Sequence, residues 1–141
     1  QDGIERTSTF DGNYIVNVIG GKEFKVGAAD RNRVLFVNAK AALIGGQRYT
    51  PIDLEASREL GSEVRDDANP FSVKGDDVFF VNLAIGTRKN RKKTTSEFKI
   101  DVTNVTNNQA LVNEYFVAGT GNIVKSYQLA MLPNIVYTLK F

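Results

Sequence analysis

The chain has 141 residues, of which 42% are hydrophobic and 24% are charged, a balance that excludes a disordered chain and indicates an ordered segment of domain size. Its formal net charge of +2 gives no global reason to expect binding to nucleic acid. Cysteine, histidine and tryptophan are absent, which removes thiolate and imidazole catalysis, disulfides and most transition-metal sites. We therefore expect no enzyme, no metal and no cofactor.

Alternation of apolar and polar residues predicts five β-strands. They cover residues 13–26, 33–46, 78–87, 97–104 and 131–141. Residues 5–10 are a possible further stub. The first strand contains the pair Gly20 and Gly21, which is typical of a bulge. Pro133 lacks a backbone donor, so we expect an edge position or an irregular segment around it.

Each predicted strand has two different faces. In the fourth strand, Phe98 and Ile100 share one face while Lys99 and Asp101 share the other. The polar-face candidates of all strands are Asn38, Lys40, Asn82, Lys99, Asp101, Thr103, Asn134, Thr138 and Lys140. Alternation alone fits both a soluble sandwich and the wall of a membrane barrel, in which the polar face lines the lumen.

The links between the predicted strands alternate strictly between short and long. Residues 27–34 and 88–97 form short links, whereas residues 47–77 and 106–124 form long ones. Strands that run up and down would then place all long links on one side, as outer-membrane barrels do. Long loops of this size are uncommon between neighbouring strands of a compact soluble domain.

The first long loop contains the punctuation of a short helix. Thr50 is the expected N-cap, Pro51 the first helical position, Asp53 a first-turn acid and Gly61 the residue just past the end. The loop over residues 47–77 is acidic, with eight acidic against four basic residues. A helix within an acidic, otherwise irregular loop is therefore predicted.

Several stretches together carry a resemblance that covers nearly the whole chain. They are "GNYIVNVIGGKEFKVG", "GGQRYTPIDLEAS", "EVRDDANPFS", "FKIDVTNVTN" and "YQLAMLPNIVYTLKF". In order and spacing they resemble the C-terminal strands of a TonB-dependent outer-membrane receptor. The resemblance implies an all-β fold of antiparallel up-and-down strands that form the C-terminal part of a transmembrane β-barrel, with long extracellular loops.

The same resemblance implies the partners and the location. Residues 1–141 would be a C-terminal portion of the barrel without the plug domain, because such barrels have about 22 strands. The partners would be the remainder of the same receptor, a TonB-type energising protein, outer-membrane lipid and a possible surface lipoprotein, with no nucleic acid. The location would be the outer membrane of a Gram-negative bacterium, and the function nutrient import. Phe141 would be the barrel-assembly signal.

Four loop residues are candidates for ligand binding near the implied extracellular mouth. Arg48, Tyr49, Arg65 and Tyr115 combine forked donors with stacking faces, which suit sugars, peptides or chelates. The alternative is that both arginines pair with loop acids such as Asp53 or Asp67 and brace the loop.

Other motifs have simpler interpretations. The basic run Arg88–Lys93 fits a nucleic-acid or anionic-lipid patch, but its place in a short link favours a solvated hairpin tip. The acid pairs at 66–67 and 76–77 match no calcium-loop spacing and are typical of hydrated loop residues. The "GTGN" stretch at 119–122 is expected to be a loop tip.

Two other architectures remain open at the level of sequence. A soluble β-sandwich or calycin-like binding module would point one set of side chains into a core: Leu83, Ile85, Phe98, Ile100, Tyr137 and Leu139. A small self-contained membrane barrel would need eight spans, more than the alternation supplies.

Overall fold

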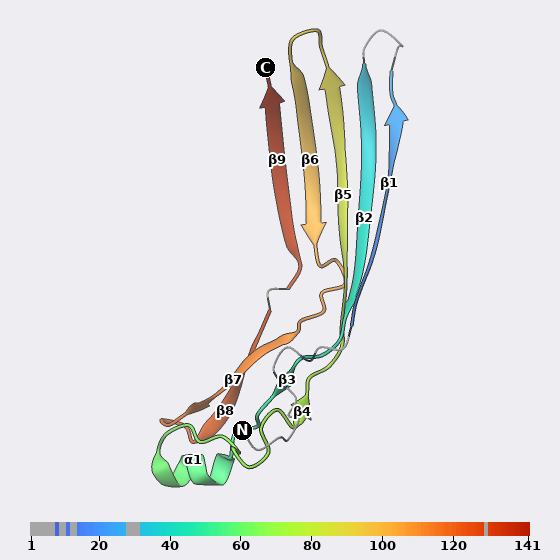
Figure 1. The fold of residues 1–141 in the computed structure, drawn as a ribbon. Helices are drawn as coiled ribbons and strands as arrows, with labels where there is room; N and C mark the ends of the chain where they lie inside the picture. The colour runs from blue at the N-terminus through green and yellow to red at the C-terminus, as the bar shows by residue number, and fades with distance from the viewer. Residues whose placement is uncertain (1–7, 9–10, 12–13, 28–31, 129) are drawn as a thin grey trace. The chain divides into compact units, whose positions relative to one another are not determined.

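The computed structural model describes residues 8, 11, 14–27, 32–128 and 130–141. The chain forms two compact units, shown in Figure 1. We call residues Val16–Leu43, Phe79–Asn108 and Leu129–Phe141 the sheet unit, and residues Gln1–Ile15, Ile44–Val78 and Gln109–Gln128 the loop unit.

The sheet unit contains a five-stranded sheet with the strand order β1-β2-β5-β6-β9. The strands are β1 (Ile15–Lys25), β2 (Arg33–Ile44), β5 (Val78–Asn90), β6 (Thr95–Thr103) and β9 (Leu132–Lys140). β6 pairs antiparallel with both β5 and β9. All five predicted strands are therefore confirmed, and the fold is mainly antiparallel β-structure.

The pairing register sorts side chains between the two faces of the sheet. Ile85, Ile100 and Ile135 lie opposite one another on three adjacent strands, so they share a face. On the other face, Asp101 lies opposite both Ala84 and Asn134. Alternation extends these assignments along each strand, which gives one apolar face and one polar face. Pro133 lies opposite Val102 on the terminal strand β9 of the sheet, a place where its missing donor is tolerated.

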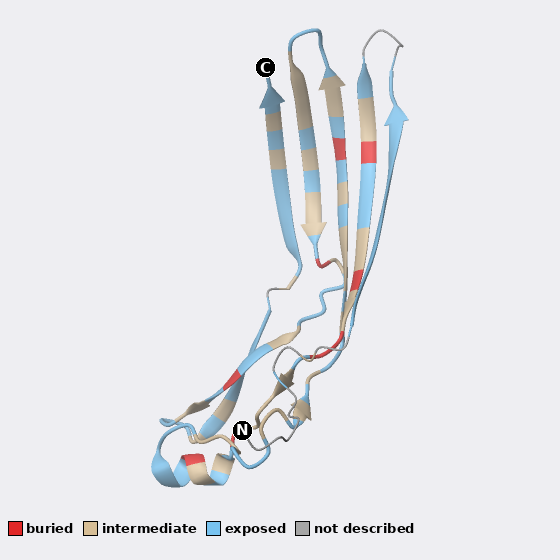
Figure 2. Cartoon of the chain, in the orientation of Figure 1, coloured by how far each residue is buried: buried red, intermediate tan, exposed pale blue. Residues whose placement is uncertain are grey.

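The apolar face is not covered within the described chain. Ile135 is 68% exposed and Tyr137 is 65% exposed, and Figure 2 shows exposed residues along β9. Among the described residues only three hydrophobic side chains are buried, and they are Phe36, Ala42 and Ile52. The six side chains that a soluble module would direct into a core are 39% to 65% exposed.

A close side-chain contact on the polar face of the sheet joins β2 and β5. Gly86 faces the ring of Phe36, and a side chain at Gly86 would collide with this ring and with the carbonyl oxygen of Phe98. The guanidinium of Arg88 lies over the same ring at 5.5 Å from its centroid. The glycine thus leaves room for an aromatic ring from the neighbouring strand, and the ring takes the place of the missing side chain.

The loop unit carries the remaining elements. β3 (Arg48–Tyr49) pairs with β4 (Val73–Lys74), and β7 (Leu111–Val117) forms a hairpin with β8 (Asn122–Tyr127). The long link predicted over residues 106–124 therefore contains most of a β-hairpin, which the alternation pattern did not predict. The "GTGN" stretch does lie at the turn of this hairpin, as predicted.

The predicted helix exists as α1 (Leu54–Leu60), but its start differs from the prediction. Asp53, not Thr50, is the N-cap, and its carboxylate accepts a hydrogen bond from the Ala56 amide at 3.0 Å. Pro51 lies before the helix because Ile52 forms an isolated bridge with Arg65, which keeps this segment extended. Gly61 ends the helix in the left-handed conformation, with φ of 65°, as expected.

Two further expectations are modified. β5 continues to Asn90, so only the second half of the basic run 88–93 lies in the turn. β1 runs through Gly20 and Gly21 as one strand. The possible stub at residues 5–10 lies outside the described residues except for Ser8.

Substitution of Gly86 tests the packing on the polar face. We expect Gly86→Ala to lower the free energy of unfolding by about 1–3 kcal/mol, because the added methyl group meets backbone as well as the Phe36 ring. Denaturant unfolding followed by circular dichroism measures the effect. Gly20→Ala is the matched control, since no atom lies within 4 Å of the added methyl group. Equal effects of both substitutions would contradict the proposed packing.

Candidate functional site

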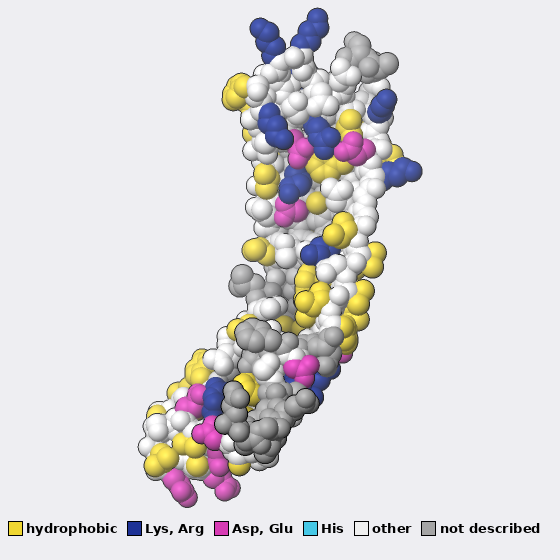
Figure 3. Space-filling view, in the orientation of Figure 1, with side chains coloured by type: hydrophobic (Ala, Val, Ile, Leu, Met, Phe, Trp, Pro, Cys, Tyr) yellow, Lys and Arg dark blue, Asp and Glu magenta, His cyan; other side chains and the backbone are white. Residues whose placement is uncertain are grey.

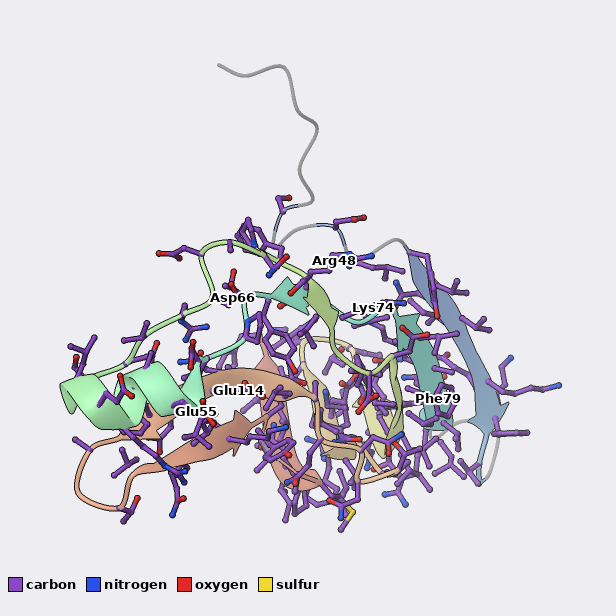
Figure 4. The ribbon with its side chains drawn as sticks, turned by 90° about the horizontal axis from the view of Figure 1, so that it is seen from below. Arg48, Glu55, Asp66, Lys74, Phe79 and Glu114 are labelled. Carbon is purple, nitrogen blue, oxygen red and sulfur yellow. The ribbon has the colours of Figure 1, made fainter. Side chains whose placement is uncertain are left out.

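The β3–β4 ladder places two cations directly opposite each other. Arg48 pairs in register with Lys74, and both are labelled in Figure 4. Like charges at such positions repel, so each cation needs its own acid. Arg48 Nε lies 3.5 Å from Asp11 Oδ2, and Lys74 Nζ lies 3.2 Å from Asp77 Oδ1. The Arg48 Nε is buried and makes no hydrogen bond to another described residue, so its attraction to Asp11 is coulombic only.

Asp77 joins three separate segments of the loop unit. It accepts hydrogen bonds from the Tyr14 hydroxyl at 2.6 Å and from the Gly46 amide at 2.9 Å, in addition to its ion pair with Lys74. These donors, the tyrosine first, lower the pKa of Asp77 to about 2. The backbone of Gly46 also approaches the carbonyl oxygen of Gly75 too closely for any side chain at position 46.

A buried acid, Glu114, forms the centre of a second cluster. Its side chain is 9% exposed and pairs with Lys125 across the β7–β8 hairpin, with Nζ and Oε1 3.3 Å apart. Burial, followed by the negative charge of Glu114, raises the pKa of Tyr49. The hydrogen bond to Glu114 raises the pKa of Lys125. Glu114 therefore acts electrostatically on both Tyr49 and Lys125.

Arg65 connects the segment after the helix to the edge of β7. Its guanidinium pairs with Glu63 at 2.8 Å and donates to the carbonyl oxygens of Thr50 at 3.0 Å and Glu114 at 3.1 Å. Glu63 in turn accepts a hydrogen bond from the Phe116 amide at 3.2 Å. The side chains of Arg65 and Glu63 therefore bond the carbonyl group of Glu114 and the amide group of Phe116 on β7. A neighbouring strand would otherwise supply such partners.

The four predicted ligand-binding residues do not form a single site. Glu114 relates to two of them in different ways. Its negative charge contributes to the raised pKa of Tyr49, and its main-chain carbonyl oxygen accepts a hydrogen bond from Arg65. Arg48 is engaged with Asp11, and alternation turns Tyr115 away from Glu114 to the other side of β7, where it is 43% exposed. The bracing alternative holds for Arg65, although its acid is Glu63 and not Asp53 or Asp67.

Glu114 and Lys125 were missed at the level of sequence. Neither residue stands out unless the hairpin register is known, since eleven positions separate them in the chain and only Glu114↔Lys125 pairing brings them together. Arg58 was missed for the same reason. It donates from Nε to the Gly121 carbonyl oxygen at 2.7 Å and thereby links α1 to the hairpin turn.

One further loop acid, Asp66, has a structural role. Asp66 accepts hydrogen bonds from the Ala68 amide at 3.2 Å and the Asn69 side chain at 2.9 Å, which stabilises a turn. Among the described residues, no group of three or more acidic side chains is arranged to hold a metal ion.

The polar-face candidates share one face of the sheet. The register aligns Lys99 with Gly86, Asp101 with Asn134, Thr138 with Glu97, Lys140 with Thr95 and Thr103 with Leu132. Alternation along β5 adds Asn82, whose Oδ1 accepts a hydrogen bond from the Asn104 amide at 2.9 Å. The Phe36 ring faces Gly86 on the polar face, so alternation along β2 places Asn38 and Lys40 on this face as well. Phe141 follows β9 and is 97% exposed.

Several charges on this face are paired. Arg88 contacts Glu97 at 2.9 Å and Glu23 at 3.2 Å, which links three strands. Lys99 and Asp101 pair along β6 at 2.9 Å. The space-filling view in Figure 3 shows blue and magenta side chains side by side over the sheet.

Comparison of the chain with protein families, with characterised proteins and with solved structures finds no match. Within the described residues, no helix is long and apolar enough to cross a membrane.

The three contacts of Asp77 predict a dependence of loop stability on acid pH. Because its pKa is lowered from 3.8 to about 2, Asp77 stabilises the loop unit above pH 4, and this contribution is lost as the pH falls towards 2. Pepsin, which is active in this range, should cleave residues 44–78 faster as the pH falls. Asp77→Asn should be cleaved rapidly already at pH 4, while Asp67→Asn should behave as the parent chain. A parent-like profile for Asp77→Asn would contradict the role of this carboxylate.

Arg65 variants test whether this residue braces the loop. We expect Arg65→Ala to destabilise the loop unit by about 1.5–3 kcal/mol, because it removes charge-assisted bonds from Glu63 and two carbonyl groups. Arg65→Lys should restore only part of this, since an ammonium cannot reproduce the fork. Hydrogen exchange of the β7 amides measures the change. Tyr115→Ser is the control and should leave exchange unchanged within about 0.5 kcal/mol, because Tyr115 is exposed. Full protection in Arg65→Ala would exclude a bracing role.

Proposed function

We propose that this chain is the C-terminal part of a TonB-dependent transporter that imports a nutrient across the outer membrane. The sheet unit would contribute barrel wall and the loop unit would contribute extracellular loops. The remainder of the receptor would supply the plug and the other strands, and a TonB-type protein would supply energy. A surface lipoprotein would be a further partner on the side of the long loops.

The observation that carries the proposal is the uncovered apolar face of the sheet. Ile85, Ile100 and Ile135 form a row across three strands, and all three are exposed. In water, an exposed apolar surface of this kind promotes association between molecules. In a membrane, it is the lipid-facing surface that a barrel wall requires.

The opposite face supports a water-filled interior. Arg88, Glu23 and Glu97 form a three-strand network on this face, and Lys99 and Asp101 form a pair 2.9 Å apart. Long antiparallel strands with lipid-facing and lumen-facing residues in strict alternation are typical of outer-membrane barrels. The two outermost strands, β1 and β9, would pair with strands from the rest of the receptor, because a barrel leaves no open edge.

The loop unit supports an extracellular position for the long links. Both links leave β-strands of one sheet and carry further secondary structure, which is common where loops have a function. Tyr115 is the predicted ligand-binding residue that we retain as a direct nutrient contact. Arg48, Tyr49 and Arg65 would act by holding the loop surface in shape.

Two lysine substitutions on opposite faces of β9 test the proposal. Ile135→Lys places a charge on the apolar face in the middle of the strand, and we expect it to destabilise the inserted full-length protein by about 2–4 kcal/mol. Thr138→Lys is the matched control, because it places the same charge on the polar face opposite Glu97. We expect it to stay within about 0.5 kcal/mol of the parent protein. Denaturant unfolding in lipid vesicles measures both.

The full-length protein should also migrate differently in detergent gels before and after heating, as outer-membrane barrels do. A detergent-free, monodisperse soluble monomer with a sharp thermal transition would instead favour the β-sandwich or calycin-like module. In water, Ile135→Lys would be neutral or improve solubility, because Ile135 is 68% exposed. That result would contradict the transporter proposal.

A further inference from the structure

One end of the sheet concentrates positive charge. Apart from Arg88, which pairs with two acids, seven cations lie near the ends of β1, β2 and β5 or in the turn after β5. They are Lys22, Lys25, Arg33, Lys89, Arg91, Lys92 and Lys93. We call this group the basic end. The dark blue side chains in Figure 3 project from this end of the sheet.

Backbone contacts place these residues at the same end. The Val26 amide donates to the Arg33 carbonyl oxygen at 2.9 Å, which joins the end of β1 to the start of β2. The Asn90 amide donates to the Asn32 carbonyl oxygen at 3.0 Å, which joins the start of β2 to the end of β5. The turn after β5 is closed by the hydrogen bond between Arg91 and Thr94 at 2.8 Å.

Three of the seven cations lie on the apolar face. Lys89 lies opposite Ser96, which lies opposite Leu139 on β9. Arg33 shares a face with Leu35 and Val37 by alternation, and Lys22 lies on the side of Phe24, with its Nζ 6.0 Å from the ring centroid. Lysine and arginine at the border of an apolar surface extend their charged groups towards headgroups while their stems cover apolar area.

Acidic side chains are placed differently. The acids of the five strands are Glu23, Glu97 and Asp101. Each contacts a cation of the polar face, Arg88 in the first two cases and Lys99 in the third. The border of the apolar face at this end therefore carries positive charge without a strand acid beside it.

Aromatic side chains accompany the cations on the apolar face. Phe98 lies opposite Tyr137, and both are exposed, as are Phe24 and Phe141. Aromatic rings next to cations, at the border of an apolar wall, are typical of the interface between hydrocarbon and headgroups.

We propose that the basic end binds anionic phospholipid headgroups of the leaflet that surrounds the short turns. This inference rests on the proposed function, because only an inserted wall brings phospholipid to this border. Lipid fits better than nucleic acid, because the rings lie on the apolar face and form no stacking platform among the turn cations. It fits better than a single small anion, because the cations are spread over three strands and a turn and are not gathered in a pocket.

Neutralisation of the turn tests the proposal. The full-length protein is purified in detergent, and bound phosphatidylglycerol and phosphatidylcholine of identical chain length are counted by native mass spectrometry. The neutral variant carries Arg91→Gln, Lys92→Gln and Lys93→Gln together. The control variant, Arg91→Lys with Lys92→Arg and Lys93→Arg, keeps the charge. We expect the preference for phosphatidylglycerol over phosphatidylcholine to be at least about tenfold smaller in the neutral variant than in the parent protein. The control variant should keep the parent preference.

Each outcome is decisive. Unchanged phosphatidylglycerol preference in the neutral variant overturns the proposal, and so does complete displacement of the lipid by millimolar inorganic phosphate, which would indicate a site for small anions. Heat-dependent migration of each variant is checked in parallel. If the parent protein lacks this migration, the transporter proposal itself fails. If the migration is present and lipid preference is insensitive to the turn, only the lipid inference fails.

Discussion

The sheet unit depends on the pairing register of its strands, because the register puts the apolar residues of neighbouring strands on the same face. Ile85, Ile100 and Ile135 are aligned by two ladders, and the same ladders align Asp101 with Ala84 and Asn134. A shift of one residue in either ladder would move charges onto the apolar face and isoleucines onto the polar face. The Glu23, Arg88 and Glu97 network crosses strands on the polar face and favours one register, because a slip would separate its members.

The loop unit is held by a different kind of interaction, in which charged side chains take the place of strand pairing. Two-residue strands such as β3 and β4 contribute little cohesion alone. Asp77 adds contacts to Tyr14, Gly46 and Lys74, while Glu63 and Arg65 occupy backbone groups of β7. Ile52 is the one buried hydrophobic residue among those described in this unit. Polar contacts therefore contribute much of the stability of the loop unit.

The sequence was sufficient to predict the strands of the sheet unit because each shows period-two alternation, and to predict α1 because Gly61 marks its end. It was insufficient for β7, where a bulge between Leu111 and Asn113 interrupts the alternation. The N-cap was misplaced because both Thr50 and Asp53 suit that role, and the bridge of Ile52 to Arg65 decides between them. Glu114 and Asp11 escaped notice because their partners are fixed by tertiary structure, which no local pattern encodes.

Gly86 and Phe36 occupy a single volume that two strands share. Natural variation at these two positions should consequently be correlated: a relative with a larger residue at 86 should compensate with a smaller one at 36. Because the ring also lies beneath Arg88, such an exchange would remove the surface on which this guanidinium rests and leave its charge to Glu23 and Glu97 alone. Covariation between positions 36, 86 and 88 would thus trace a steric and electrostatic unit that spans β2 and β5.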